Sequence, residues 1–82
     1  RPGSIVSMPQ TEIKMERTGN IVTLTNTGKH PAIGVHVEVP EKMDQLIVSE
    51  NYIWLNPQES KILKINLESP VIVKGWNLQS PY

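Results

Sequence analysis

The chain of 82 residues contains no cysteine. This absence excludes disulfide bonds, thiol nucleophiles and thiolate metal sites, so the hydrophobic core has to hold the fold together without them. A chain of this length forms one domain, and it buries roughly 60 to 65% of the surface that its unfolded form exposes. A deep catalytic cleft would take a large share of so small a core.

The sequence also lacks an excess of charge of either sign, because eight Lys and Arg balance eight Asp and Glu without forming runs. A basic patch is the usual electrostatic footprint of nucleic-acid binding and of attraction to acidic membranes. No apolar run approaches the ~18 residues that cross a bilayer. We therefore expect neither nucleic acid nor a membrane as a partner.

The side chains that carry most enzyme chemistry are sparse. His30 and His36 are the two histidines, and no further histidine or cysteine can complete a zinc site, so we expect both to be exposed. No serine lies in a Gly-x-Ser-x-Gly motif, and no glycine-rich phosphate loop occurs. Glu50 and Glu59 flank an aromatic stretch, but carboxylates beside turns are ordinarily solvated. The sequence predicts no catalytic residue, no metal ligand and no cofactor.

What the sequence does contain is a series of short runs in which apolar and polar residues alternate, as in half-buried β-strands. We expect strands over residues 11–16, 21–25, 32–39, 46–48, 52–55, 61–67 and 71–76. Turn residues separate them about every eight to twelve positions, which is typical of an antiparallel β-sandwich. The predicted fold is all-β, an immunoglobulin or fibronectin-like sandwich of six or seven strands.

The composition of the first residues differs from that of the remainder. Residues 1–10 contain two prolines, a glycine and two serines, so we expect a linker or the lead-in to the first strand. Residues 11–82 are predicted to form the sandwich domain. Because the chain begins at Arg1 without an initiator methionine or an apolar leader, we interpret it as an excised domain.

The core faces of two strands can be predicted from residue parity. Val22 and Leu24 share one face of the strand at 21–25, and threonines occupy the other. In the strand at 32–39 the odd positions are all β-branched: Ile33, Val35, Val37 and Val39. We predict that these odd positions face the core and that small or polar residues face solvent.

The stretch 49–60 contains the densest aromatic cluster. Tyr52 and Trp54 have one parity, and Ile53 and Leu55 have the other, so the aromatics point outward if the aliphatics face the core. An exposed indole adds nothing to a monomer's core. We interpret Trp54, with Tyr52 beside it, as a contact for a neighbouring domain or a platform for a sugar ring. The alternatives are that Trp54 covers the rim of the sandwich or that the parity is slipped by one.

Two aromatic residues have structural interpretations. Trp76 is predicted to close one end of the sandwich, with Gly75 allowing a close backbone approach or a bulge. Tyr52 is predicted to be a corner tyrosine whose hydroxyl bonds the backbone of a loop, by analogy with other sandwiches.

The stretch 49–60 resembles the Ser-Asp-Asn-Tyr-Phe-x-Leu-x-Pro-Gly-Glu-Ser segment in the C-terminal immunoglobulin-like domain of glycoside hydrolase family 2 enzymes. The similarity is greatest to the exo-β-D-glucosaminidase and β-mannosidase branch. The run at 22–28 and the Gly-Trp-Asn sequence at 75–77 are also similar, so the resemblance covers residues 20–77. It implies structural roles for Asn51, Tyr52, Leu55, Pro57, Glu59, Gly75 and Trp76.

The chain departs from this pattern at three positions. Glu50 replaces the usual Asp, Ile53 replaces an aromatic residue, and Gln58 replaces the glycine of the turn. A residue other than glycine resists positive φ, so we expect the turn at 56–59, with Pro57 presetting φ, to be a type such as type I.

The resemblance implies an accessory domain. In such enzymes both catalytic glutamates lie in a separate (β/α)8 barrel, so no catalytic residue is transferred to this chain. The implied partners are the other domains of an exo-acting β-glycosidase, periplasmic or secreted, with an oligosaccharide as a further candidate ligand. A carbohydrate-binding or fibronectin-like interaction module is the alternative.

Overall fold

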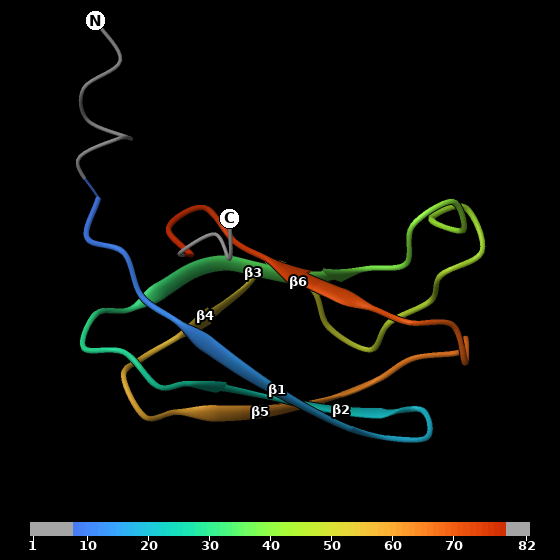
Figure 1. The fold of residues 1–82 in the computed structure, drawn as a ribbon, viewed down its shortest axis with the longest axis horizontal. Coiled ribbons are helices and arrows are strands. Elements are labelled where there is room, and N and C mark those ends of the chain that lie inside the picture. Colours follow the sequence, from blue (N-terminus) through green and yellow to red (C-terminus); the bar gives the residue numbers. More distant parts are fainter. Residues whose placement is uncertain (1–7, 79–82) are drawn as a thin grey trace, which may run out of the picture.

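The computed structural model describes residues 8–78, which form two layers of antiparallel strands (Figure 1). The strands are β1 (Ile13–Thr18), β2 (Ile21–Asn26), β3 (Ala32–Glu38), β4 (Ile53–Leu55), β5 (Ser60–Lys64) and β6 (Ile72–Lys74). The predicted immunoglobulin-like sandwich is confirmed. Residues 1–7, most of the predicted lead-in, and residues 79–82 lie outside the described residues. Within 8–78, no helix is long and apolar enough to cross a membrane.

The two sheets have the strand orders β1-β2-β5 and β4-β3-β6. In the first sheet, β1 and β2 form a hairpin in which Thr18 pairs with Ile21 across a two-residue turn. Gly19 occupies the first turn position with φ of 60°, a conformation that glycine adopts at little steric cost. The hairpin makes β1 the edge of its sheet, and β6 is an edge of the other.

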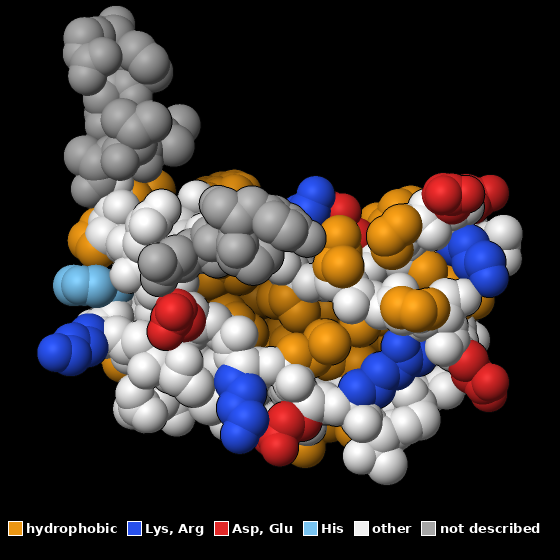
Figure 2. Space-filling view, in the orientation of Figure 1, with side chains coloured by type: hydrophobic (Ala, Val, Ile, Leu, Met, Phe, Trp, Pro, Cys, Tyr) orange, Lys and Arg blue, Asp and Glu red, His pale blue; other side chains and the backbone are white. Residues whose placement is uncertain are grey.

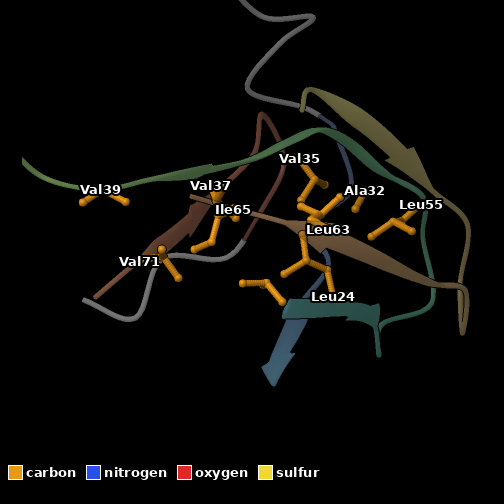
Figure 3. Packing of buried hydrophobic residues seen from close by; sticks show 10 residues of the cluster. Leu24, Ala32, Val35, Val37, Val39, Leu55, Leu63, Ile65 and Val71 are labelled. Atoms are coloured by element: carbon orange, nitrogen blue, oxygen red, sulfur yellow. The ribbon is translucent and has the colours of Figure 1, made fainter. Parts of the chain in front are cut away.

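The core lies between the sheets, and side chains from both layers point into it (Figure 3). Val22 and Leu24 of β2 are fully buried, as their parity predicts. Leu63 of β5 and Leu55 of β4 are buried with them. Full burial of one such side chain stabilises the fold by about 1.5–3 kcal/mol, so these few residues supply much of the stability of a chain without disulfides.

The predicted alternation along β3 is wrong at the start of the strand. Val35, Val37 and Val39 are buried as predicted, but Ala32 is also buried and Ile33 is only half-buried. The register with β4 shifts between Ala32 and Val35. Gly34 lies inside this shift with φ of 67°, so the strand contains a bulge that reverses the parity of the residues before it.

The strand predicted at residues 46–48 is not formed. Val48 makes a single antiparallel bridge with Ile65, and Ile47 is exposed. The side chain of Asn66 holds this backbone, because its Oδ1 accepts from the amide of Ile47 at 2.7 Å and its Nδ2 donates to the carbonyl of Gln45 at 2.8 Å. Backbone bonds from the amide of Asn66 to the carbonyl of Ile47 at 3.2 Å and from the amide of Ser49 to the carbonyl of Lys64 at 3.0 Å accompany the bridge, so the apolar run is a loop with one bridge and not a full strand.

The turn after β4 also differs from the prediction. The amide of Glu59 donates to the carbonyl of Asn56 at 3.0 Å, and Gln58 has φ of 67°. Pro57 followed by a residue with positive φ defines a type II turn, so the expected type I turn is wrong. Contacts outside the turn fix the strained residue, since the amide of Gln58 donates to the carbonyl of Asn26 at 2.7 Å.

Asn26 is buried at the end of β2 and connects four segments. Its Oδ1 accepts from the hydroxyl of Thr11 at 2.7 Å and from the amide of Gly28 at 3.0 Å. Its Nδ2 donates to the carbonyls of His30 at 2.7 Å and Leu55 at 3.0 Å. The side-chain amide uses both oxygen lone pairs and both hydrogens, so it fastens one end of the sandwich.

Candidate interaction face on the second sheet

Most of the exposed aromatic surface area of the described chain lies on the outward side of sheet β4-β3-β6. We call it the aromatic face. Its members are Tyr52, Trp54, Trp76, Ile72, His36, Glu38 and Lys74. Parity and register place them together, because His36 and Glu38 alternate with the buried valines of β3 and pair with Lys74 and Ile72.

A charged network lies at the centre of the aromatic face. Nε2 of His36 is 2.9 Å from Oε2 of Glu38, and Nζ of Lys74 is 3.4 Å from Oε1 of Glu38. The hydrogen bond from His36, assisted by Lys74, holds the pKa of Glu38 below its usual value, although partial burial opposes this shift. The carboxylate therefore stays ionised and ties β3 to β6.

The prediction of exposed histidines is wrong for His36. Only 12% of its side chain is exposed, because the ring of Tyr52 stacks on it with centroids 4.4 Å apart. Nδ1 of His36 lies 3.0 Å from the carbonyl oxygen of Gly34. The ring is thus held on one face and at both nitrogens.

Tyr52 lies in the loop before β4 and has φ of 56°, a conformation that costs a residue other than glycine about 1–2 kcal/mol. The stack on His36 holds its ring, and Oδ1 of the adjacent Asn51 accepts from the amide of Val37 at 2.9 Å. Among residues 8–78, the Tyr52 hydroxyl has no hydrogen-bond partner, so the predicted corner bond is not found there. Its ring instead extends the aromatic face.

Trp54 projects outward from the middle of β4, with 58% of its surface exposed. Leu55 is buried on the other side of the strand, so the predicted parity agrees with the structure. The indole Nε1 donates to Oδ1 of Asn56 at 2.9 Å. This bond orients the ring and satisfies its polar atom, so the exposed area that remains is apolar.

Trp76 lies flat against β3 at the bulge. A Cβ atom added to Gly34 would come 3.0 Å from Cε2 of its indole, so the ring covers the glycine backbone. The Trp76 amide donates to the carbonyl of Ile33 at 2.9 Å, yet 69% of the residue is exposed. At Gly75, a Cβ atom would come 2.8 Å from Leu78, which is the close approach that the sequence suggests.

Asn77 follows Trp76 and is buried. Its Oδ1 accepts from the amide of Ile33 at 2.9 Å, and its Nδ2 donates to the carbonyls of Pro9 and Pro31 at 2.9 and 2.7 Å. It thus fastens the lead-in and the start of β3 to the end of β6. Each residue of the Gly-Trp-Asn sequence therefore has a structural role. Gly75 allows the close approach of Leu78, Trp76 covers Gly34, and the buried side-chain amide of Asn77 makes hydrogen bonds to the backbone.

The residues of the stretch 49–60 that are predicted to be structural lie in the core or at the turn after β4. Leu55 is in the core, and Pro57 is at the second position of the type II turn. Oε1 of Glu59 accepts from the amide of Asn56 at 2.7 Å and closes that turn. Glu50 lies 3.5 Å from Nζ of Lys61, so each flanking glutamate has a local partner.

No catalytic constellation was found among residues 8–78. The described residues contain no group of three or more His, Cys, Asp or Glu that could hold a metal ion. A shallow open depression is lined by Arg17, Gly19, Glu68 and Pro70. The guanidinium of Arg17 donates to the carbonyls of Leu67 and Ser69, so it holds a loop there. The aromatic face is therefore the candidate site.

Sequence reasoning missed the central part of this face. The prediction of an exposed His36 follows from the ordinary exposure of isolated strand histidines, and it is wrong because Tyr52, from the loop before β4, covers the ring. The alternation of His36 and Glu38 along one strand face was the available signal, since residues two apart on a strand are neighbours.

Two antiparallel sheets of three strands packed over a shared core form an immunoglobulin-like β-sandwich. The chain belongs to the exo-beta-D-glucosaminidase Ig-fold domain family, whose model matches residues 4–78. This match confirms the family resemblance of the sequence. Searches of curated proteins and of solved structures gave no match. The family supports an accessory role for this domain.

Proposed function

We propose that this chain is a non-catalytic accessory domain of a family 2 glycoside hydrolase. Its parent is an exo-acting β-glycosidase of the exo-β-D-glucosaminidase or β-mannosidase type, in the periplasm or outside the cell. The domain packs against the other domains of the parent and supports their arrangement. The family match over residues 4–78 supports the class of domain.

The observation that carries the packing role is the aromatic face. Trp54 and Trp76 leave more than half of their surface exposed, and Ile72 is exposed on the same face of the sheet. Exposed apolar side chains gathered on one face mark interaction sites in folded proteins, and aromatic residues are enriched at interface centres. The network of His36, Glu38 and Lys74 gives the face a fixed polar centre.

The test is Trp54→Ala in the full-length protein, with Ile62→Ala as a matched control. Ile62 is on the outward side of the other sheet and is 62% exposed, compared with 58% for Trp54. Trp54→Ala should lower the melting temperature of the full-length protein by several degrees and leave that of the isolated chain unchanged. Ile62→Ala should leave both unchanged. A full-length protein insensitive to Trp54→Ala would contradict the packing role.

A carbohydrate-binding module is the second candidate, because the hydrogen bond to Asn56 leaves the flat side of the Trp54 indole available for a sugar ring. Titration of the isolated chain with chitosan and mannan oligosaccharides distinguishes the two. A Kd of about 1 mM or tighter, lost in Trp54→Ala, would favour this candidate over domain packing.

A further inference from the structure

The imidazole ring of His36 faces an oxygen atom at each of its two nitrogens. Nδ1 lies 3.0 Å from the carbonyl oxygen of Gly34, and Nε2 lies 2.9 Å from Oε2 of Glu38. A carbonyl oxygen and an ionised carboxylate only accept hydrogen bonds, and neutral imidazole has a single N–H to donate. The doubly protonated ring serves both acceptors, so the geometry fits the charged form of His36.

Loss of one proton would disturb the contact with Gly34 first. A hydrogen bond to a carboxylate is stronger than one to a backbone carbonyl, so Nε2 keeps its proton and Nδ1 loses it. The lone pair of Nδ1 would then point at the carbonyl oxygen of Gly34. Because only 12% of the His36 side chain is exposed, water has little access to separate the two atoms, and the ring has to turn.

The charged and titratable groups around the ring come from three elements. On β3, the hydrogen bond from His36 lowers the pKa of Glu38, and the ionised carboxylate in turn favours a positive ring. On β6, Lys74 pairs with His36 and repels a positive ring, but its Nζ lies 3.4 Å from the other oxygen of the same carboxylate. Before β4, Tyr52 stacks on the ring, and an aromatic face attracts a cation.

Charges farther from the ring do not add a field of one sign. Eight Lys and Arg balance eight Asp and Glu, and Figure 2 shows the two signs interspersed over the face in view. Exposed charges more than about 10 Å apart are largely screened at roughly 0.1 M salt. The contacts of His36 with Glu38, Lys74 and Tyr52 therefore determine which form of its ring is favoured.

The position of Tyr52 depends on this ring. Its φ of 56° is left-handed, a conformation that is unfavourable for a residue other than glycine, and 65% of the residue is exposed. Among residues 8–78, its hydroxyl has no hydrogen-bond partner. The stack on His36, with ring centroids 4.4 Å apart, is therefore the contact that holds the Tyr52 ring.

We propose that His36 is a proton-dependent switch in the aromatic face. The doubly protonated ring joins the carbonyl of Gly34 to the carboxylate of Glu38 and holds Tyr52 stacked on it. When Nδ1 loses its proton, the ring turns away from Gly34, and Tyr52 leaves the stack. Histidine is the side chain that ordinarily changes charge between about pH 5 and 8, so Tyr52 is ordered in mild acid and released in mild base.

The switch is a property of the chain itself, but its effect on domain packing rests on the proposed function. Tyr52 lies on the face that we propose to pack against the rest of the parent enzyme. Ordering its ring before contact lowers the entropy cost of association. The domain therefore packs more firmly in mild acid than in mild base.

Nuclear magnetic resonance of the complete chain tests the switch directly. At about pH 5 both ring nitrogens of His36 should be protonated and its ring should show cross-peaks with Tyr52, whereas at about pH 8 Nδ1 should be unprotonated and these cross-peaks lost. A ring of His36 that is neutral in mild acid would overturn the proposal. Cross-peaks that persist in mild base would do the same.

His30 provides the matched control, because it is the other histidine of the sequence and is exposed. The ring resonances of Tyr52 should shift between about pH 5 and 8 in the parent chain and in His30→Gln, and they should stay constant in His36→Gln. A shift that remains in His36→Gln, or that is lost in His30→Gln, would contradict the assignment of the switch to His36.

The full-length protein separates failure of the switch from failure of the packing role. The loss of melting temperature that Tyr52→Ala causes beyond its loss in the isolated chain should be larger at about pH 5 than at about pH 8. An equal loss at both pH values, with Trp54→Ala still destabilising, would refute the control of packing by His36. If Trp54→Ala has no effect at either pH, the packing role fails, and the resonances of the chain decide on the switch.

Discussion

The indole of Trp76 lies against the backbone of Gly34, where an added Cβ atom would come 3.0 Å from Cε2 and the ring would have to shift by a few tenths of an ångström. Gly34 also has φ of 67°, so two independent causes require glycine at this bulge. Gly19 provides a matched comparison, because its φ is 60° but a Cβ atom added there would have no atom within 4 Å.

Gly34→Ala should therefore destabilise the chain more than Gly19→Ala. Gly19→Ala should cost about 1–2 kcal/mol for the left-handed backbone, and Gly34→Ala should cost a further 1–3 kcal/mol, roughly, for overlap with the indole. Urea unfolding measures both. In a Trp76→Ala background, Gly34→Ala and Gly19→Ala should destabilise the chain by similar amounts. A difference that persists would show that the Trp76 indole does not cause the larger effect of Gly34→Ala.

Gln58→Gly should stabilise the chain. Its φ of 67° strains glutamine by about 1–2 kcal/mol, while glycine there costs about 0.5–1 kcal/mol of additional backbone entropy. The expected net gain is up to about 1 kcal/mol, measured as a higher urea midpoint with an unchanged slope.

Gln58→Ala is the control for the glutamine side chain. Its Nε2 lies 3.5 and 3.4 Å from the carbonyl oxygens of Thr27 and Gly28, distances at which hydrogen bonds are weak. Alanine keeps the backbone strain and should change stability little. If both variants destabilise the chain, the side-chain contacts outweigh the strain.

Much of the fold could be predicted from the sequence because strand burial follows residue parity. Val22 and Leu24 alternate with threonines, and the outward direction of Trp54 follows from the parity of Leu55. Each of these inferences depends on residues adjacent in the chain, for which the period of two is a direct geometric constraint. The outward direction of Trp54 was therefore predictable, whereas the place of Trp76 against Gly34 was not.

The rest depended on contacts between distant residues. Gln58 adopts positive φ because Asn26 binds its backbone, and residues 46–48 form a loop because Asn66 binds theirs. His36 is covered because sheet pairing brings Tyr52 onto its ring. The local conformational propensity of these residues does not favour any of the three arrangements. The residues next to them in the sequence do not indicate which distant residue will be the contact partner.

The lowered pKa of Glu38 predicts a pH-dependent contribution to stability. The folded chain binds this proton less tightly than the unfolded chain, whose carboxyl has the ordinary value of 4.5. The contribution is therefore fully present above pH 4.5, and it is lost as the pH falls through the lower pKa of the folded state. Glu38→Gln should be less stable than the parent chain at pH 7, and the difference should disappear in strong acid.

Glu16→Gln is the control for this pH dependence. Glu16 lies on β1, 65% exposed, and its carboxylate is 4.0 Å from Nζ of Lys14, a separation at which an exposed ion pair contributes little. Urea midpoints of the variants and the parent chain from pH 3 to 7 supply the measurement. A Glu38→Gln curve parallel to that of the parent would show that the network with His36 and Lys74 does not stabilise the fold.

Asn26→Ala should be among the most damaging single substitutions. It leaves the hydroxyl of Thr11, the amide of Gly28 and the carbonyl of Leu55 without their partner at a site that is fully buried. Each buried polar group left unpaired costs about 1–3 kcal/mol, so a loss of at least about 3 kcal/mol is expected. A domain of this size has a total stability on the order of 5–10 kcal/mol.

Asn66→Ala tests whether burial causes that cost. The Asn66 side chain also makes hydrogen bonds to the backbone, at Ile47 and Gln45, but it is exposed. Water can replace its bonds, so the loss should be about 0.5–1.5 kcal/mol. Urea unfolding of the two variants measures the difference, and equal losses would mean that the number of hydrogen bonds, rather than their burial, sets the cost of losing such a side chain.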